Sequence, residues 1–554
     1  MRNLNKIFII FGLLIVSSCG LTDISGNLND PNNVGPDALD LTTLNNKAQA
    51  EFGDFFRESS ETGMELTRML AMTGGDRYER VYQPQSHNDI WGAAYNNALQ
   101  PIEVIIKDGT QKTAWRHVGT AKIMKAYIYM TLVDFFGDVP FSEANQADIT
   151  GNFNPKVDKG QDIYNACIKL LDEAIVDLAK TTAVSLSRDV FYAGDVKRWT
   201  ALANTLKLKG YMNLRLTDQA KAKTEITTLL AADLIDTEAE EFTYKYAPET
   251  VPNRARAELY RQFYQPALGG ADGYLGNYFM FQAYKGKGIE DPRWRYYFYR
   301  QVGSKKEALN RDPNAIPCSV TPKPDHYIAD GQPFCTFEPG FYGRDHGNND
   351  GIPPDGPFLT APGVYPFGGN VDNTAVDNTT FFGRTIQGQG ANGAGIEPIW
   401  MSYFTDFLKA EAALTLGTGG DAKALTEAGV KASIARVQKF ATQKSLAVTA
   451  PVTPTADYVA KVNELYAAST DKLDVSMKEY YLSLFGNGVE AYNLYRRTGS
   501  PKKIQPMRAT LGGKFIRSLV YPADFVNLNP NAKQKVFDAY NKVFWDNNPD
   551  DFIN

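Results

Sequence analysis

The sequence has little of what metal enzymes and nucleophilic enzymes use. Its 554 residues include four histidines and four cysteines, and these do not form pairs with metal-ligand spacing. The HExxH, GxSxG and P-loop motifs are all missing. We therefore expect no catalytic centre of these classes and no zinc site.

The sequence also lacks long apolar runs and basic blocks. After the first residues, no stretch approaches the roughly 20 apolar residues that a membrane-spanning helix needs. The net charge is −5, without the basic face that nucleic-acid binding requires. These absences argue against an integral helical membrane protein and against a nucleic-acid partner.

The N-terminus has the pattern of an export signal. Arg2 and Lys6 precede the apolar run 7–16, which is too short to span a bilayer. Small residues then lead to Cys19, as in a bacterial lipobox. We predict a lipoprotein signal peptide at 1–18, acylation of Cys19 and a tether at 19–45. The alternative is an ordinary signal peptide that happens to contain a cysteine.

The other cysteines suggest two different roles. Cys167 lies on the apolar side of a predicted helix and is expected to be a buried thiol. Cys318 and Cys335 flank a Pro-containing loop, and an exported location permits oxidation. We predict a disulfide between them. Two free thiols are the alternative.

Apolar residues at steps of three and four predict a mostly α-helical protein. The stripes lie near 121–135, 163–178 and 199–214, and Asp195 is a candidate N-cap for the third. Further helices are expected in five other segments: 219–234, 397–416, 420–442, 454–470 and 472–485. Because each stripe needs a partner, we expect paired helices stacked side by side, as in tetratricopeptide arrays, within a single domain at 46–554.

A loop-rich excursion interrupts this pattern at about 265–395. It is rich in Gly, Pro, Asn and Asp. Segments of this length without secondary structure are usually functional or disordered, and the many aromatic residues here argue against disorder. We interpret it as an ordered face on the helical scaffold.

Several segments resemble the SusD/RagB family of surface lipoproteins. The segment 126–141 ends in FGDVP, and 89–97 contains Trp91 followed by Tyr95-Asn96-Asn97. The loop segments 343–351 and 363–369, and the later segments 409–414 and 490–499, are also similar to family elements.

The resemblance implies about four tetratricopeptide-like helix pairs with a loop-rich ligand-binding face. It also implies an outer-membrane lipoprotein that is exposed at the cell surface. Such a protein binds oligosaccharides and delivers them to a SusC-like TonB-dependent transporter. Some family members take peptides instead. The acidic residues that often follow the anchor cysteine are reduced here to Asp23.

Aromatic and polar residues in Gly-rich segments are the candidate ligand contacts. Sugars bind to flat aromatic faces and to hydrogen-bonding side chains presented by loops. The candidates are Asp76, Arg77, Tyr78, Tyr82, Tyr274, Tyr278 and Trp294. The alternative for each aromatic residue is packing inside the loops.

The loop 345–351 contains oxygen ligands at short spacing. Asp345, Asn349 and Asp350 are candidate calcium ligands, although the loop lacks full EF-hand spacing. The alternative is a turn held by Asx hydrogen bonds. No other cofactor is expected.

Three classes of function fit these features. The first is a non-enzymatic binding lipoprotein for oligosaccharide or peptide uptake. The second is a surface glycosidase or peptidase, which would need two suitably placed carboxylates. The third is a helical scaffolding lipoprotein. We favour the first.

Overall fold

The computed structural model describes residues 40–249, 255–265, 273–311, 318, 321–348, 358–376, 378–537 and 541–553. The predicted signal peptide, Cys19, Asn349 and Asp350 lie outside the described residues. Within the described ranges, no helix is both long and apolar enough to cross a membrane.

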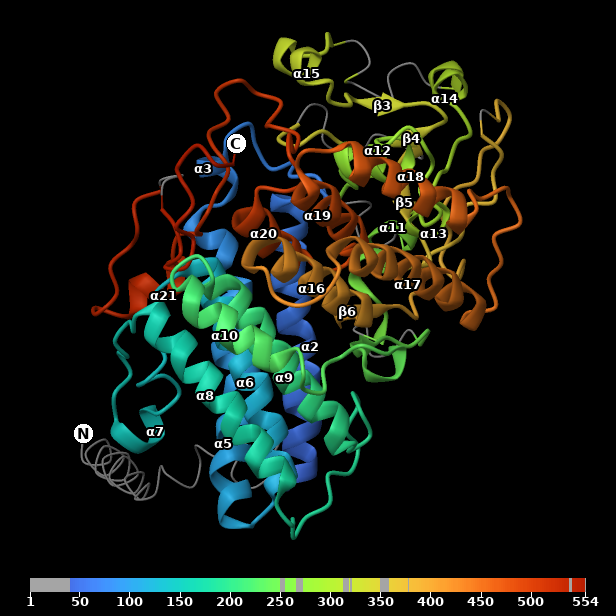
Figure 1. Ribbon diagram of the computed structural model, residues 1–554. Helices are drawn as coiled ribbons and strands as arrows, with labels where there is room; N and C mark the ends of the chain where they lie inside the picture. The colour runs from blue at the N-terminus through green and yellow to red at the C-terminus, as the bar shows by residue number, and fades with distance from the viewer. Residues whose placement is uncertain are drawn as a thin grey trace, which may run out of the picture.

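Long helices stacked side by side form one half of the molecule (Figure 1). Neighbours along the chain pack together: α2 with α5, α6 with α8, α9 with α10, α16 with α17 and α19 with α20. Their bounds are α2 Leu41–Leu66, α5 Leu99–Gln111, α6 Trp115–Phe136, α8 Gly160–Ala179, α9 Val196–Leu214, α10 Gln219–Leu229, α16 Ser402–Leu416, α17 Ala422–Gln443, α18 Thr455–Ala468, α19 Lys472–Ser483 and α20 Gly488–Thr498. The predicted mostly helical scaffold of paired helices is confirmed.

The central position of α6 follows from its sequence. It is apolar on nearly all sides, and it packs against α2, α5, α8 and α9. A helix without a polar face is stable only when other elements surround it. Even His117 is fully buried in this helix.

Two helix starts illustrate local rules. Asp195 caps α9 as predicted, accepting from the backbone N–H groups of Lys197 at 2.9 Å and Arg198 at 3.3 Å. The predicted tether at 19–45 extends too far along the chain, because Asp40 caps α2 and this helix begins at Leu41. Asp40 accepts from the N–H of Thr42 at 2.8 Å.

The prediction of a helix over 397–416 is wrong for its first residues, since α16 begins at Ser402. Strand β6, Ile396–Trp400, occupies this segment and pairs antiparallel with β1, Phe242–Lys245. The partner strand lies about 150 residues earlier, so local periodicity did not reveal the pairing. Trp400, the last residue of this strand, is fully buried.

The excursion at 265–395 is ordered wherever it is described, and it holds only short elements. Helix α11, Glu258–Tyr264, comes just before it, and the helices within it are α12 Asn277–Tyr284, α13 Trp294–Tyr297, α14 Lys305–Arg311 and α15 Asp325–Asp330. Two small antiparallel pairs join β2 Phe298–Tyr299 to β5 Ala361–Pro362 and β3 Thr336–Phe337 to β4 Phe341–Tyr342. The remaining short elements are α3 Tyr78–Val81, η4 Pro84–His87, α4 Asn88–Trp91, η5 Gly92–Ala98, α7 Ala147–Thr150, η6 Glu238–Glu240 and α21 Ala523–Leu528.

Buried ion pairs attach the loop-rich region to the scaffold. Arg293 is fully buried, and its Nη2 donates to Asp291 Oδ2 at 2.6 Å. Its Nη1 donates to the hydroxyls of Ser433 in α17 and Ser483 in α19, at 2.9 and 2.7 Å. One guanidinium therefore holds the excursion against two scaffold helices.

Candidate functional site

Tyr78 is an anchor of its loop and does not present a ring to solvent. It lies in α3 and is 2% exposed. Its hydroxyl accepts from Arg68 Nη2 at 2.7 Å and lies 3.0 Å from His346 Nε2. Burial raises the pKa of Tyr78, which therefore stays protonated and available for this network.

Tyr82 is covered in the same way. It is 3% exposed, and its hydroxyl donates to Glu65 Oε2 at 3.3 Å. Its ring is stacked with the imidazole of His87, and the two ring centroids lie 6.3 Å apart. Burial raises the pKa of Glu65 to about 7. Tyr78 and Tyr82 thus stabilise the 73–87 loop from within.

The three aromatic candidates of the excursion are also buried. Tyr274, Tyr278 and Trp294 are 1–2% exposed. The guanidinium of Arg344 lies 4.6 Å from the Tyr274 ring centroid, and Tyr278 contacts Tyr481.

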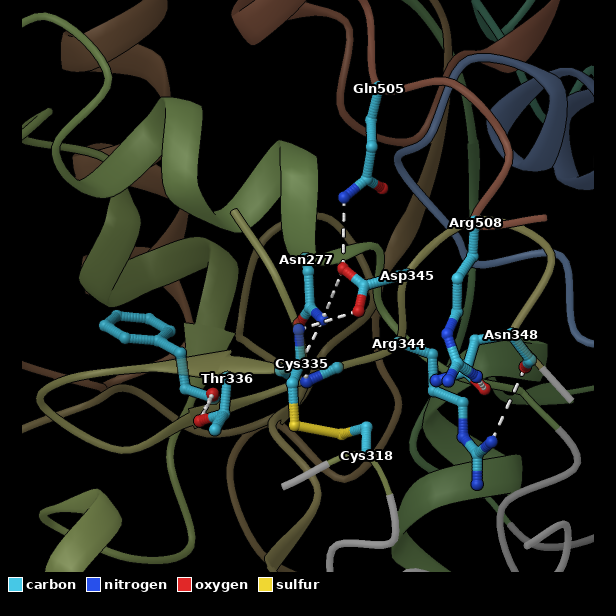
Figure 2. Close-up of a disulfide and its surroundings, with 11 residues drawn as sticks. Asn277, Cys318, Cys335, Thr336, Arg344, Asp345, Asn348, Gln505 and Arg508 are labelled. Atoms are coloured by element: carbon cyan, nitrogen blue, oxygen red, sulfur yellow. Dashed lines mark hydrogen bonds between the residues drawn. A yellow bond between two sulfur atoms is a disulfide. The ribbon is translucent and has the colours of Figure 1, made fainter. Parts of the chain in front are cut away.

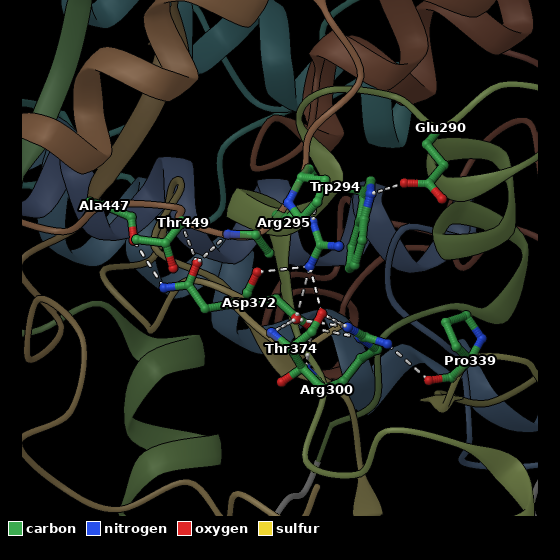
Figure 3. A network of polar contacts seen from close by, with 12 residues as sticks. Glu290, Trp294, Arg295, Arg300, Pro339, Asp372, Thr374, Ala447 and Thr449 are labelled. Carbon is green, nitrogen blue, oxygen red and sulfur yellow. Dashed lines mark hydrogen bonds and ion pairs between the residues drawn. The ribbon is translucent and has the colours of Figure 1, made fainter. Parts of the chain in front are cut away.

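Trp294 belongs to a polar network (Figure 3). Its indole N–H donates to Glu290 Oε2 at 3.2 Å, and its ring packs beside the guanidinium groups of Arg295 and Arg300. All five aromatic candidates are therefore buried in this structure, as in the packing alternative. Large aromatic side chains give an irregular region the apolar core that it otherwise lacks. Contact between a ligand and any of these five aromatic rings stays a prediction.

Asp76 and Arg77, by contrast, are accessible. Their side chains are 45% and 40% exposed. Asp76 accepts from Arg80 at 2.9 Å, while Arg77 lies 3.6 Å from Glu79. Both pairs are solvated and weak, so a ligand can replace them at small cost.

A pocket of about 220 Å³ adjoins Arg77. It is lined by Arg77, Tyr78, Glu79, Leu511, Gly512, Gly513, Lys514 and Phe537. The N–H of Tyr78 donates to the carbonyl of Gly512 at 3.1 Å, which ties the two loops together. Leu511 is 75% exposed. Sequence reasoning missed the residues after 510, because nothing local relates them to a loop more than 400 positions earlier.

The Cys318–Cys335 disulfide is confirmed. The two Cα atoms lie 5.6 Å apart, within the usual range for a disulfide. Cys167 is the buried free thiol that was predicted.

Asp345 lies next to this disulfide and has a structural environment (Figure 2). It is fully buried. Its Oδ1 accepts from Asn277 at 3.1 Å and from Gln505 at 3.0 Å, and its Oδ2 accepts from the N–H of Cys335 at 2.7 Å. Both oxygens thus face N–H donors, which do not coordinate calcium. Among the residues that the structure places, no group of three or more His, Cys, Asp or Glu side chains forms a metal cluster.

Two other polar pockets border the scaffold. One, of about 320 Å³, is lined by Asp54, Arg57, Glu58, Glu61, Tyr246, Arg256, Glu258, Arg261 and Gln262. Partial burial raises the pKa of Glu61 to about 8, although Arg57 opposes the shift. The other, of about 440 Å³, is lined by Gly286, Lys287, Leu465, Ala468, Ser469, Asp474, Val475, Lys478 and Glu479.

Comparison with known proteins places the chain among outer-membrane binding proteins. Residues 31–313 match a SusD-like family described as starch-binding and associating with the outer membrane. Residues 394–543 match the SusD and RagB outer-membrane lipoprotein family. No curated protein matches the chain.

Solved structures show the same fold. A chitin-binding protein is 21% identical, with a TM-score of 0.61 over 92% of this chain and 100% of its own. A SusD/RagB family protein from Bacteroides thetaiotaomicron is 18% identical, with a TM-score of 0.63 over 93% of this chain and 100% of its own. A Bacteroidetes SusD-like protein is 18% identical, with a TM-score of 0.65 over 92% and 100%. The chain therefore belongs to the SusD-like family of outer-membrane nutrient-binding proteins.

Proposed function

We propose that this protein binds oligosaccharides at the cell surface and delivers them to a SusC-like TonB-dependent transporter. The observation that carries the proposal is the match of more than half the chain to a family described as starch-binding. The chitin-binding protein of the same fold supports a carbohydrate ligand.

The accessible rim around Arg77 is our candidate for ligand contact. Asp76 and Arg77 supply a hydrogen-bond acceptor and donors for sugar hydroxyls. Leu511 and Phe537 supply apolar surface in the adjoining pocket for the C–H faces of a sugar. The buried Tyr78–Arg68 contact keeps the loop in place, which lowers the entropy cost of binding.

The proposal includes the lipid anchor and the absence of turnover. Acylated Cys19 would hold the protein at the outer membrane, facing the cell exterior, by about 0.8 kcal/mol per buried CH₂. Bound glycan would then leave unchanged through the transporter.

Calorimetry on the purified protein with a panel of neutral oligosaccharides and peptides tests the proposal. We expect at least one oligosaccharide to bind without product formation. The Asp76→Ala/Arg77→Ala variant should weaken that binding at least tenfold. The control Lys461→Ala/Glu464→Ala removes an exposed ion pair of α18, in which Lys461 Nζ lies 2.7 Å from Glu464 Oε1. This variant should bind the oligosaccharide with unchanged affinity.

Two outcomes would contradict the proposed function, and a third would contradict only the assigned site. Binding of peptides alone would make this a peptide importer component. Cleavage of the oligosaccharide would make it an enzyme. Normal binding by Asp76→Ala/Arg77→Ala would leave the function in place and remove the assigned site.

A further inference from the structure

A further pocket, lined by residues distant in sequence from Arg77, has an excess of positively charged side chains. It measures about 420 Å³, within the range of small-molecule sites. Its lining residues come from the start of α9, the turn η6, the β1–β6 pair and the end of α17. They are Phe191, Arg198, Glu238, Ala239, Glu241, Thr243, Lys245, Tyr246, Gly395, Ile396, Arg436, Phe440, Gln443 and Lys444.

The two carboxylates of this pocket are already paired. Glu241 accepts from Arg436 Nε at 2.7 Å and from the Ser402 hydroxyl at 3.1 Å. Glu238 accepts from Lys439 Nζ at 2.7 Å. Neither carboxylate therefore neutralises the remaining lysines.

Lys245 and Lys444 are the uncompensated cations. In the described part of the chain, neither ammonium lies within 4 Å of a carboxylate. The pKa of Lys444 lies below its ordinary value because of burial and because of the charges of Lys245 and Arg436. Lys444 is thus close enough to Lys245 and Arg436 for their charges to act on it, and an anion bound beside Lys444 would offset this repulsion.

Regular structure fixes the positions of these cations. Lys245 ends β1, opposite Ile396 of β6. Lys444 caps α17, and its N–H donates to the carbonyls of Phe440 and Ala441 at 3.2 and 3.0 Å. Nη1 of Arg436 has no hydrogen-bond partner among the described residues, which leaves a donor for an oxyanion.

We infer that this pocket binds the carboxylate or sulfate group of an acidic oligosaccharide. The inference rests on the proposed function and narrows its ligand to a chemical class. Lys245 and Lys444 supply the charge, Arg436 the directed N–H groups, and the buried rings of Phe191, Tyr246 and Phe440 a rigid wall.

The test measures binding of trigalacturonate, a sulfated chondroitin tetrasaccharide and neutral maltotriose by calorimetry. We expect at least one acidic probe to bind the unaltered protein at least tenfold more tightly than maltotriose. Raising NaCl from about 20 mM to about 300 mM should weaken this binding, because the Debye length then falls below about 10 Å.

The Lys245→Ala/Lys444→Ala variant should lose at least tenfold in affinity for the acidic probe. Lys431→Ala is the matched control, since it removes an exposed lysine of the same helix that pairs with Glu427. Unchanged melting temperatures will show that the variants fold.

Two results would overturn the inference. One is that neither acidic probe binds more tightly than maltotriose. The other is that the double variant binds the acidic probe as tightly as Lys431→Ala does. Neutral oligosaccharides binding normally in either case would leave the proposed function standing, so the two failures are distinguishable.

Discussion

At the residue scale, buried charges hold the irregular half of the molecule together. Asp372 is fully buried and accepts from Arg300 Nε at 2.7 Å and Nη2 at 2.8 Å (Figure 3). Arg295 Nη1 lies 3.4 Å from the same carboxylate. A single acidic side chain therefore compensates two buried guanidinium groups, at a point where the backbone has almost no regular hydrogen bonding.

Removing this carboxylate should destabilise the protein strongly. Asp372→Ala leaves two buried arginines without a counter-charge, and we expect a loss of about 3–5 kcal/mol in the free energy of unfolding. Urea unfolding followed by circular dichroism measures it. The exposed Asp551→Ala should stay within about 0.5 kcal/mol of the unaltered protein. A similar small effect for Asp372→Ala would show that the network is not stabilising.

Glu397 should make stability depend on pH near neutrality. It is 4% exposed, and burial raises its pKa to about 8, above the ordinary 4.5, although the Tyr246 hydroxyl donates to it at 2.8 Å. The folded state therefore holds a proton between about pH 4.5 and 8 that the unfolded state releases, so stability falls as pH rises through this window.

Glu397→Gln keeps the shape and removes the titration. We expect its free energy of unfolding to lose about 1–2 kcal/mol less than that of the unaltered protein between pH 5 and pH 8, after allowance for partial relaxation. Unfolding curves at the two pH values give the comparison. Equal pH dependence in both proteins would show that Glu397 is ionised in the folded state.

At the element scale, helix patterns were predictable and strand pairings were not. The segments near 472–485 and 420–442 became α19 and α17, since three- and four-residue apolar steps reflect burial of one helix face. Strand β6 was missed because its partner lies far away in the sequence. For Tyr278 and Trp294, ligand contact and packing inside the loops both stayed open, because a loop sequence does not show which neighbours will cover its rings.

The crossing of α2 and α20 depends on two glycines. A Cβ on Gly488 would lie 2.0 Å from the carbonyl oxygen of Ser60, and a Cβ on Gly63 would lie 2.2 Å from the Gly488 carbonyl oxygen. These contacts are with backbone atoms, which cannot move aside as a flexible side chain can. The two helices therefore approach as closely as their backbones allow.

Gly488→Ala should force these helices apart. We expect a loss of roughly 1–3 kcal/mol in the free energy of unfolding, as in overpacked cores. Gly92→Ala is the control, since its nearest neighbour would be Asn96 Nδ2 at 3.8 Å, and it should be neutral. Thermal unfolding of both variants decides the matter, and equal melting temperatures would refute the close crossing.

At the scale of the whole molecule, candidate sites combine distant parts of the chain. The Arg77 rim joins residues 77–79 to 511–514, and the cationic pocket joins residues 191–198 to 436–444. Asp76 and Arg77 could be selected from sequence because polar, Gly-rich segments are usually exposed. Lys245 and Lys444 could not, because only the fold brings them together.

The anchor prediction concerns the molecule's location. Cys19→Ala should move the protein from the membrane fraction to the soluble fraction, because acylation needs the thiol. Immunoblots of cell fractions follow it, with Cys167→Ala as the control that keeps the anchor. Membrane retention of Cys19→Ala would show that another segment holds the protein.

The most direct test of the central claim is co-isolation from the outer membrane. The tagged full-length protein is purified in mild detergent from cells of its own organism, and its partners are identified by mass spectrometry. We predict that one large TonB-dependent barrel protein co-purifies in about equal amount. Recovery of the protein alone, or from the cytoplasm, would contradict a role as the capture component of an importer.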